Sequence, residues 1–335
     1  MAKKRRKRVH PLVSALTLAP LAIGVATPML RTPPTPKPHV KHVAAAAIDA
    51  CTLPFDAIRQ THSIDSSCGP AGSASSAPQS AQNEAKNNFC ASGSPVNLTF
   101  ANFAQLQQAA ESAGIPFGGT NLPSDRGPLH NILSLGSQGR VGEGSVVRLA
   151  AFVMTAHYSN VSKGESVNCG IPGNENNDIH IVLGQSAVPE GAKLTEAQEC
   201  ASVTAEISPH FRPDVWSPDS LNHNNAHMFR FTGQLFFDAA HRPCVGGTGA
   251  NPKRVAIWEV HPVYAVDICV DPGNHCSADS EANWVPLSDF VGSPEPSNET
   301  WLRLPDGIRD AFRSATLPPP QSHAPGSHGQ AGPAL

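Results

Sequence analysis

The chain has 335 residues, with 24 Lys and Arg, 27 Asp and Glu, and a net charge of −3 with neutral His. Its first 26 residues hold six of the basic side chains and no acidic ones, so their removal leaves 18 basic against 27 acidic residues, a net charge of about −9. Nonspecific nucleic-acid binding relies on Lys and Arg that displace counterions from phosphates. The composition therefore argues against nucleic acid as a partner.

The N-terminus has the organisation of a secretory signal. A basic cluster, KKRRKR, is followed by the apolar stretch Leu12–Ala26 and by small residues that suit a signal peptidase. We therefore predict a signal peptide over residues 1–26 and a secreted, periplasmic or cell-envelope location. A nuclear-localisation signal is one alternative, but it does not explain the apolar stretch. An uncleaved anchor is another, although fifteen residues that include Pro20 and Gly24 are short for a membrane span.

Both ends of the remaining chain have compositions typical of segments without a fixed fold. Residues 27–50 are Pro-rich and then Ala-rich, which predicts an extended tether. Residues 291–335 are predicted to form a C-terminal extension that is disordered after about residue 316. We expect no stable membrane span after signal cleavage.

Eight cysteines in an exported chain indicate disulfide bonds, and no CxxC pair suggests a zinc ribbon or a redox motif. Proximity in the sequence favours pairing of Cys68 with Cys90 and of Cys169 with Cys200. The full set is Cys51, Cys68, Cys90, Cys169, Cys200, Cys244, Cys269 and Cys276.

Residues 51–140 predict a small helical segment tied by a disulfide. Apolar residues recur at helical spacing in TFANFAQLQQAAESAG (99–114), where Thr99 suits the N-cap and Gly114 the C-terminal end. A second helix is expected in SAQNEAKNNFC (80–90), which has one weak apolar face. Because the segment has few large apolar residues, we expect it to pack on the following domain and to be held there by a disulfide.

Residues 141–290 predict a mainly β fold, a five-stranded OB-like β-barrel. Five antiparallel strands with a long first strand and a helix between strands three and four have the order of an OB-fold. Gly233, inside the fourth strand, suits a bulge or a sharp bend where a small barrel closes. The strands are expected at residues 145–159, 178–184, 202–208, 226–238 and 254–269.

Alternation assigns the side chains of each strand to two faces. Apolar residues such as Ile181, Ala205 and Val260 point into the barrel, which leaves polar residues on the other face. In the strand order 1-2-3-5-4, strands two, three and five are neighbours, so their polar residues meet. Pro262 cannot donate a ladder hydrogen bond and predicts a bulge or an unpaired edge. The polar residues expected to meet are His180, Glu206, Glu259 and His261.

Two imidazoles and two carboxylates can bind zinc or another divalent ion. In this interpretation His180, Glu206 and His261 are the metal ligands, and Glu259 is a catalytic general base that activates a bound water. The alternative is structural. His and Glu on paired strands form ordinary cross-strand pairs, and a covering N-terminal segment would bury and satisfy all four.

Further polar residues lie in the connections of the predicted barrel. OB-folds hold ligands with the connection between strands four and five and with the one between strands one and two. The alternative for each residue is that it caps an element or forms a turn. The residues predicted to contact a ligand are His180, Glu206, His210, Arg212, Asp238 and His241.

Several strings in the chain resemble a group of uncharacterised exported bacterial proteins. They are WEVHP (258–262), FTGQLFFDAAHRPC (231–244), AEISPHFRP (205–213) and NDIHIVL (177–183), and the N-terminal string SIDSSCGPAGSASSAPQSAQNEAKNNFC is similar to the leading part of the longer members. The resemblance covers about Cys51 to Trp284. It carries no established activity, so it implies no function and no catalytic residue.

The sequence supports three hypotheses about function. The first is an exported, noncatalytic binding module for an extracytoplasmic metal ion, glycan or protein, because an OB-like strand order occurs without any complete catalytic motif. The second is a divalent-metal-dependent hydrolase of phosphodiesters or glycans. The third is a structural envelope protein in which the polar cluster only stabilises the sheet.

Overall fold

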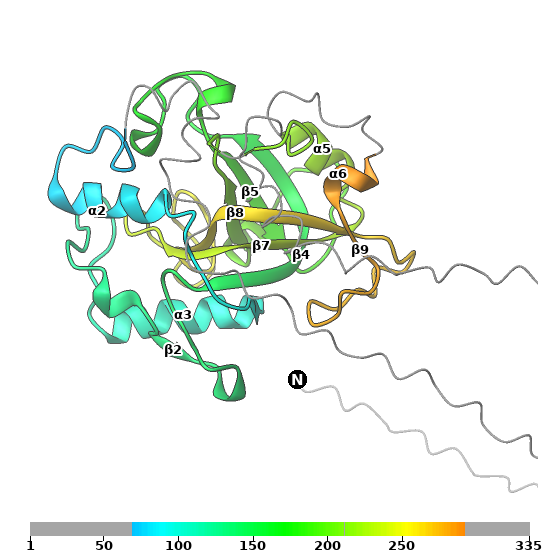
Figure 1. Ribbon diagram of the computed structural model, residues 1–335, viewed down its shortest axis with the longest axis horizontal. Coiled ribbons are helices and arrows are strands. Elements are labelled where there is room, and N and C mark those ends of the chain that lie inside the picture. Colours follow the sequence, from blue (N-terminus) through cyan, green and yellow to red (C-terminus); the bar gives the residue numbers. More distant parts are fainter. Residues whose placement is uncertain (1–68, 211, 292–335) are drawn as a thin grey trace, which may run out of the picture. The chain divides into compact units, whose positions relative to one another are not determined.

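The computed structural model describes residues 69–210 and 212–291 (Figure 1). The predicted signal peptide, the tether and the C-terminal extension lie outside these residues. So do Cys51 and Cys68, and with them the predicted Cys68–Cys90 disulfide.

The described chain is mainly β, and five strands close into a barrel. The order around the barrel is β4-β5-β6-β8-β7, and β4 pairs with β7 to close it. The β6–β8 pair is parallel, whereas the other barrel pairs are antiparallel. This is the order 1-2-3-5-4 that the sequence predicts, but the expectation of five antiparallel strands is wrong for the β6–β8 pair. The strands are β4 Val146–Tyr158, β5 Ile179–Gly184, β6 Val203–Ile207, β7 Met228–Phe237 and β8 Trp258–Cys269.

Shorter elements surround the barrel (Figure 1). β1 extends the sheet in parallel on β4, β9 pairs with β8, and β2 and β3 form a separate hairpin. The strands are β1 Val96–Leu98, β2 Leu133–Ser134, β3 Arg140–Val141 and β9 Trp284–Pro286; the α-helices are α2 Ala77–Lys86, α3 Phe100–Ser112, α4 Glu196–Cys200, α5 Pro218–His223 and α6 Leu287–Phe290; the 3-10 turns are η2 Gly127–Leu129, η3 Gly136–Gln138, η4 Ser166–Asn168 and η5 Asn174–Asn176.

The barrel interior follows the alternation of the sequence. Every apolar residue predicted to point inward on β5, β6, β7 and β8 is buried, and full burial of such side chains stabilises a fold by about 1.5–3 kcal/mol each. The helix predicted between the third and fourth barrel strands is α5. The inward residues are Ile179, Ile181, Leu183, Val203, Ala205, Ile207, Phe229, Phe231, Leu235, Phe237, Trp258 and Val260.

The predicted bulge lies in the paired stretch of β7 and β8. Their register shifts on both sides of Gly233, so that Gly233 pairs with Val263 while Leu235 pairs with Val260. A Cβ at Gly233 would lie 2.5 Å from the carbonyl oxygen of Pro262. The bulge therefore requires glycine at this position and places Pro262 in the extra stretch of β8.

The two N-terminal helices bury very different faces. α3 begins at the predicted N-cap Thr99, which forms a capping box with Asn102, and buries apolar residues such as Phe103 and Leu106. α2 begins at the N-cap Ser76 and buries Gln82, Asn83 and Lys86. The weak apolar face predicted for this helix is therefore wrong, because α2 covers a polar surface of the barrel.

Two disulfides are described in full. Cys200 bonds with Cys244, so the predicted Cys169–Cys200 pair is wrong, and Cys269 bonds with Cys276. Cys90 and Cys169 are also disulfide-bonded. Among residues 69–210 and 212–291, no helix has the length and apolar character needed to cross a bilayer.

Candidate functional site

The polar residues of three neighbouring barrel strands form one connected network. The antiparallel register sets His180 of β5 opposite Glu206 of β6. The parallel register of β6 with β8 places Glu259 opposite Thr204, which brings His261 beside Glu206. The structure thus gathers the four residues that alternation put on one face. They do not face solvent, because Glu206, Glu259 and His261 are buried, and α2 contributes Lys86 and Gln82 to the network.

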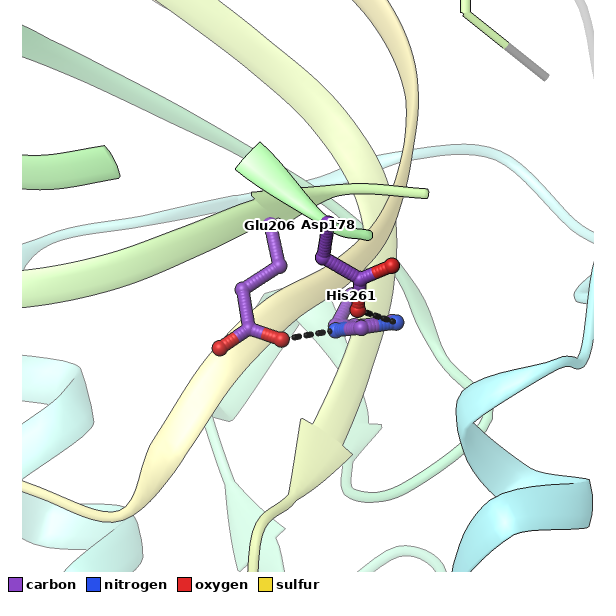
Figure 2. Close-up of side chains that lie close together, drawn as sticks. All are labelled: Asp178, Glu206 and His261. Carbon is purple, nitrogen blue, oxygen red and sulfur yellow. Dashed lines mark hydrogen bonds and ion pairs between the residues drawn. The ribbon is translucent and has the colours of Figure 1, made fainter. Parts of the chain in front are cut away.

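The centre of the network is a triad of Asp178, Glu206 and His261 (Figure 2). His261 Nδ1 lies 2.6 Å from Glu206 Oε2, and His261 Nε2 lies 3.7 Å from Asp178 Oδ2. Each of the three offers one ligand-type atom, and these atoms all lie within 4.8 Å of one another. Asn168 Nδ2 donates to Asp178 Oδ1 at 2.9 Å, whereas Asp178 Oδ2 is buried and has no hydrogen-bond partner.

The network reaches the surface through His180. His180 Nε2 lies 3.1 Å from Glu206 Oε1 and 3.4 Å from Glu165 Oε1, and its side chain is 22% exposed. Ser159 Oγ also donates to Glu165. The ring of exposed His157 lies 5.9 Å from that of His180 on the neighbouring strand. The contacts therefore run from the surface, through His180 and Glu206, to His261.

Lys86 supplies a cation from the covering helix. Its ammonium donates to Glu206 Oε2 at 3.0 Å and lies 5.8 Å from the centre of the Phe236 ring. Burial lowers the pKa of Lys86, but Glu206 and the other carboxylates of the network raise it by more, so that it stands well above its ordinary value. Lys86 is therefore a permanent positive charge against the barrel.

A second arm of the network runs from Glu259 to the surface at His241. Arg254 donates to Glu259 Oε2 and to Asp238 Oδ2, each at 2.6 Å. Asp238 also bonds to His241 Nδ1, and Gln82 Nε2 of α2 donates to its other oxygen at 3.3 Å. Asp238 and His241 thus belong to the same network as the triad, joined to it through Arg254 and Glu259.

Burial and nearby charges shift the pKa values of the buried carboxyl groups, upward for some and downward for others. Burial, then the nearby charge of Glu165, raises the pKa of Asp178 to about 6. Burial, then Glu206, raises the pKa of Glu259 to about 7 despite its contact with Arg254. Burial also acts on Glu206, but the cations around it hold its pKa well below the ordinary value. Glu206 is therefore the anionic centre of the network.

The pKa values of the two imidazoles, His180 and His261, are raised. Burial lowers the pKa of His180, but the charge of Glu206 and the contact with Glu165 raise it to about 9. Burial and Lys86 lower the pKa of His261, and Glu206 raises it above its ordinary value. The carboxylates therefore favour the protonated form of both rings.

Two residues predicted to bind a ligand lie apart from the triad. Arg212 donates to the backbone carbonyls of Asn174, Glu175 and Asn177, so it holds the connection before β5. His210 is buried and packs edge-on against Phe89.

A hollow of about 390 Å³ opens near the C-terminal end of α2. Gln234 lines it and also donates to the backbone carbonyl of His261, at 2.9 Å. None of the triad residues lines it. The other lining residues are Glu84, Ala85, Asn87, Asn88, Phe89, Cys90, Arg126, His130, Glu143 and Gly144.

Four charged residues of the network, Asp178, Glu165, Lys86 and Arg254, appear in none of the sequence-based site predictions. Asp178 could have been found from the sequence, because it stands two residues before His180 and alternation puts both on one face. Glu165 lies in a loop, Lys86 on a helix and Arg254 ahead of β8, and each reaches the network from an element whose position the sequence does not provide. Comparisons with protein-family models, curated proteins and solved structures find no match.

The arrangement can hold a cation but offers little room for chemistry on a substrate. Two carboxylates and an imidazole converge on one buried point, and this donor set suits zinc or another divalent first-row ion. Glu259 is fully buried and bonded to Arg254. A general base must come within about 3 Å of the proton that it removes, or act through one water.

Proposed function

We propose that this protein is an exported, noncatalytic binding protein with an OB-like barrel, and that its ligand is a divalent metal ion held by Asp178, Glu206 and His261. The closed barrel with its order β4-β5-β6-β8-β7 supports the OB-like assignment. The disulfides support an oxidising, extracytoplasmic location.

The observation that carries the proposal is Asp178 Oδ2, which is buried and accepts no hydrogen bond. An unpartnered carboxylate oxygen in a protein interior is costly, and a cation relieves that cost. Asp178 Oδ2 faces His261 Nε2 at 3.7 Å, too long for a hydrogen bond and suitable for two ligands of one ion. Glu206 supplies the third donor, and the ligand-type atoms of the three residues lie within 4.8 Å of one another.

The choice of binding over catalysis rests on burial. A hydrolytic metal site keeps an open position for water and substrate. Asp178, Glu206 and His261 are all almost fully buried, and the hollow of about 390 Å³ does not reach them. Glu259, the predicted base, is held by Arg254. A bound ion at this point would tie β5, β6 and β8 together.

The test is metal binding by the full chain. After treatment with a chelator, the protein is titrated calorimetrically with Zn²⁺ and, in separate runs, with Mn²⁺ and Ca²⁺, and the untreated protein is analysed for elements. We expect one ion per chain and release of protons on binding, because ligands must be deprotonated. Asp178→Asn should weaken binding by at least about 10-fold.

Asp267→Asn is the matched control. Asp267 is a second buried aspartate with one oxygen that accepts no hydrogen bond, and it lies outside the triad. It should keep the affinity of the wild type. Absence of binding for all three metals, or equal binding by Asp178→Asn, would refute the metal assignment. Turnover of a phosphodiester or glycan that is lost in Glu259→Gln would refute the noncatalytic assignment.

A further inference from the structure

A second charged cluster lies on the barrel, away from the triad. Arg148 of β4, Arg230 of β7 and Asp267 of β8 are all buried. Glu281 approaches them from the segment between Cys276 and β9, and its side chain is 42% exposed. The exposed carboxylate thus closes a buried pair of guanidinium groups.

The two arginines hold the two oxygens of one carboxylate. Arg148 Nη1 donates to Glu281 Oε1 at 2.7 Å, and Arg230 Nη2 donates to Glu281 Oε2 at 2.8 Å. Arg230 also donates to Asp267 Oδ2 through Nε and Nη2, at 2.9 and 2.8 Å, and the Trp284 ring lies 5.1 Å from its guanidinium carbon. Asp267 and Trp284 therefore fix the orientation of Arg230 independently of Glu281.

The charges of this cluster leave one cation without a permanent partner. Arg148 and Arg230 carry two positive charges, and Asp267 beneath them supplies one negative charge. Glu281 neutralises the remaining positive charge, but its side chain is partly exposed. Arg148 Nε is buried and has no hydrogen-bond partner, and Arg148 Nη1 donates to Glu281. Removal of Glu281 would leave a buried charge that attracts one monovalent anion.

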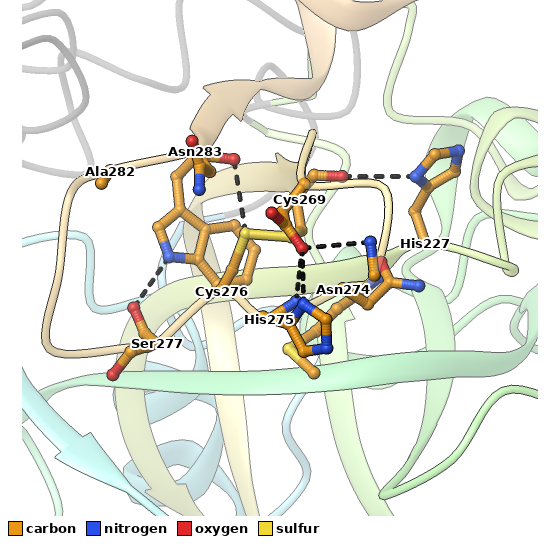
Figure 3. Close-up of a disulfide and its surroundings, with 12 residues drawn as sticks. His227, Cys269, Asn274, His275, Cys276, Ser277, Ala282 and Asn283 are labelled. Carbon is orange, nitrogen blue, oxygen red and sulfur yellow. Dashed lines mark hydrogen bonds and ion pairs between the residues drawn. A yellow bond between two sulfur atoms is a disulfide. The ribbon is translucent and has the colours of Figure 1, made fainter. Parts of the chain in front are cut away.

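The segment that carries Glu281 is attached mainly by polar contacts. Residues 277–283 contain no large apolar side chain. Asn97 Nδ2 donates to Asp279 Oδ1 at 2.5 Å, and the Trp284 indole donates to the Ser277 carbonyl at 2.9 Å. The Cys269–Cys276 disulfide anchors the segment at its start (Figure 3). Segments with few buried apolar contacts open at lower free energy than a core does.

We propose that Arg148 and Arg230 form a carboxylate-binding site, and that Glu281 is its internal occupant, displaced when an external carboxylate binds. Paired guanidinium groups match the planar fork of a carboxylate. A phosphate dianion would leave excess negative charge beside Asp267, whereas a carboxylate brings the cluster to neutrality. The external carboxylate belongs either to an acidic peptide or to a small organic acid.

The test uses the full chain with Glu281→Gln and Glu281→Ala. Each variant is titrated calorimetrically with acetate, with inorganic phosphate and with a short Glu-rich peptide, and its fold is checked by circular dichroism. We expect Glu281→Ala to bind a carboxylate probe at least about 10-fold more tightly than the wild type. Binding of acetate identifies a small acid as sufficient, and binding of the peptide alone identifies an acidic peptide.

Two further variants make the result specific. Asp279→Ala removes a carboxylate from the same segment without touching the arginines, and it should leave carboxylate binding as weak as in the wild type. Arg148→Met in the Glu281→Ala background should abolish the gain. If folded Glu281→Ala and Glu281→Gln bind no carboxylate more tightly than the wild type does, the site does not exist. Tighter binding of phosphate than of acetate would overturn the carboxylate assignment.

Discussion

The network under α2 and the cluster under Glu281 lie on the same barrel and have opposite composition. The first is rich in carboxylates, and the side chain that covers it is a cation, Lys86. The second is rich in guanidinium groups, and the side chain that covers it is an anion, Glu281. The covers also differ in exposure, since the Lys86 side chain is 11% exposed and that of Glu281 42% exposed. A buried cover is a structural member of its site, whereas an exposed one can exchange with a ligand.

The largest effect should come from Arg254→Met. Arg254 bonds to Glu259 and Asp238 in the protein interior, and its removal leaves two buried carboxylates without their main cation. We expect a loss of about 3–5 kcal/mol in the free energy of unfolding, measured with denaturant. Lys253→Met is the control, because Lys253 forms only an exposed pair with Glu199. Equal unfolding midpoints for the two variants would contradict the role given to Arg254.

The two covers can be compared directly. Lys86→Met should cost about 3 kcal/mol, because it breaks a buried ion pair with Glu206. Glu281→Gln should cost less than Lys86→Met, because the Glu281 side chain is 42% exposed and water can reach the guanidinium groups from its side. Denaturant unfolding of both variants measures the difference. A larger loss for Glu281→Gln would show that exposure does not distinguish the covers.

Removal of the disulfide beside the second cluster should have a smaller effect on stability. Cys269 and Cys276 lie seven positions apart in the sequence and close a short loop, so their joint replacement by Ala should cost about 2 kcal/mol through chain entropy. The freed segment should also exchange its amide hydrogens faster around Glu281, while the amides of β5 and β6 keep their protection. Hydrogen exchange followed by mass spectrometry checks both statements. Faster exchange in β5 would mean that the two clusters are coupled.

The smallest effect is a pH dependence at Glu281. Partial burial raises the pKa of this carboxyl, but Arg230 and Arg148 lower it by more, so that it stands below its ordinary value. A lowered pKa in the folded state gives stability that is present above the ordinary Glu value of about 4.3 and is lost as the pH falls through the folded value. The melting temperatures of the wild type and Glu281→Gln should therefore converge on acidification. A constant difference from pH 7 to pH 3 would exclude this contribution.

The barrel could be predicted because its information is local. Strict alternation on β5 and β6 assigns each side chain to a face, and the order of elements then makes β5, β6 and β8 neighbours. His180, Glu206 and His261 follow from that pattern. The covers could not be predicted, because Lys86 and Glu281 reach their partners across 120 and 133 residues, and periodicity does not encode such distances.

The disulfide error has a topological cause. Proximity in the sequence favours Cys169 for Cys200, but β6 and β8 are parallel neighbours. The segments that precede them therefore begin at the same edge of the barrel, where Val255 N donates to the Ser202 carbonyl. Cys200 and Cys244 lie in these two segments and bond to each other. A parallel pair thus determines a disulfide that chain distance does not suggest.

The polar face of α2 has a consequence for synthesis of the chain. Gln82, Asn83 and Lys86 emerge long before Glu206, which follows Lys86 by 120 residues. A helix of ten residues is marginal in isolation, and an apolar face left waiting for its partner strands would promote aggregation. Water can solvate this face until the barrel forms. The helix can therefore leave the ribosome ahead of the barrel without a hydrophobic surface that needs protection.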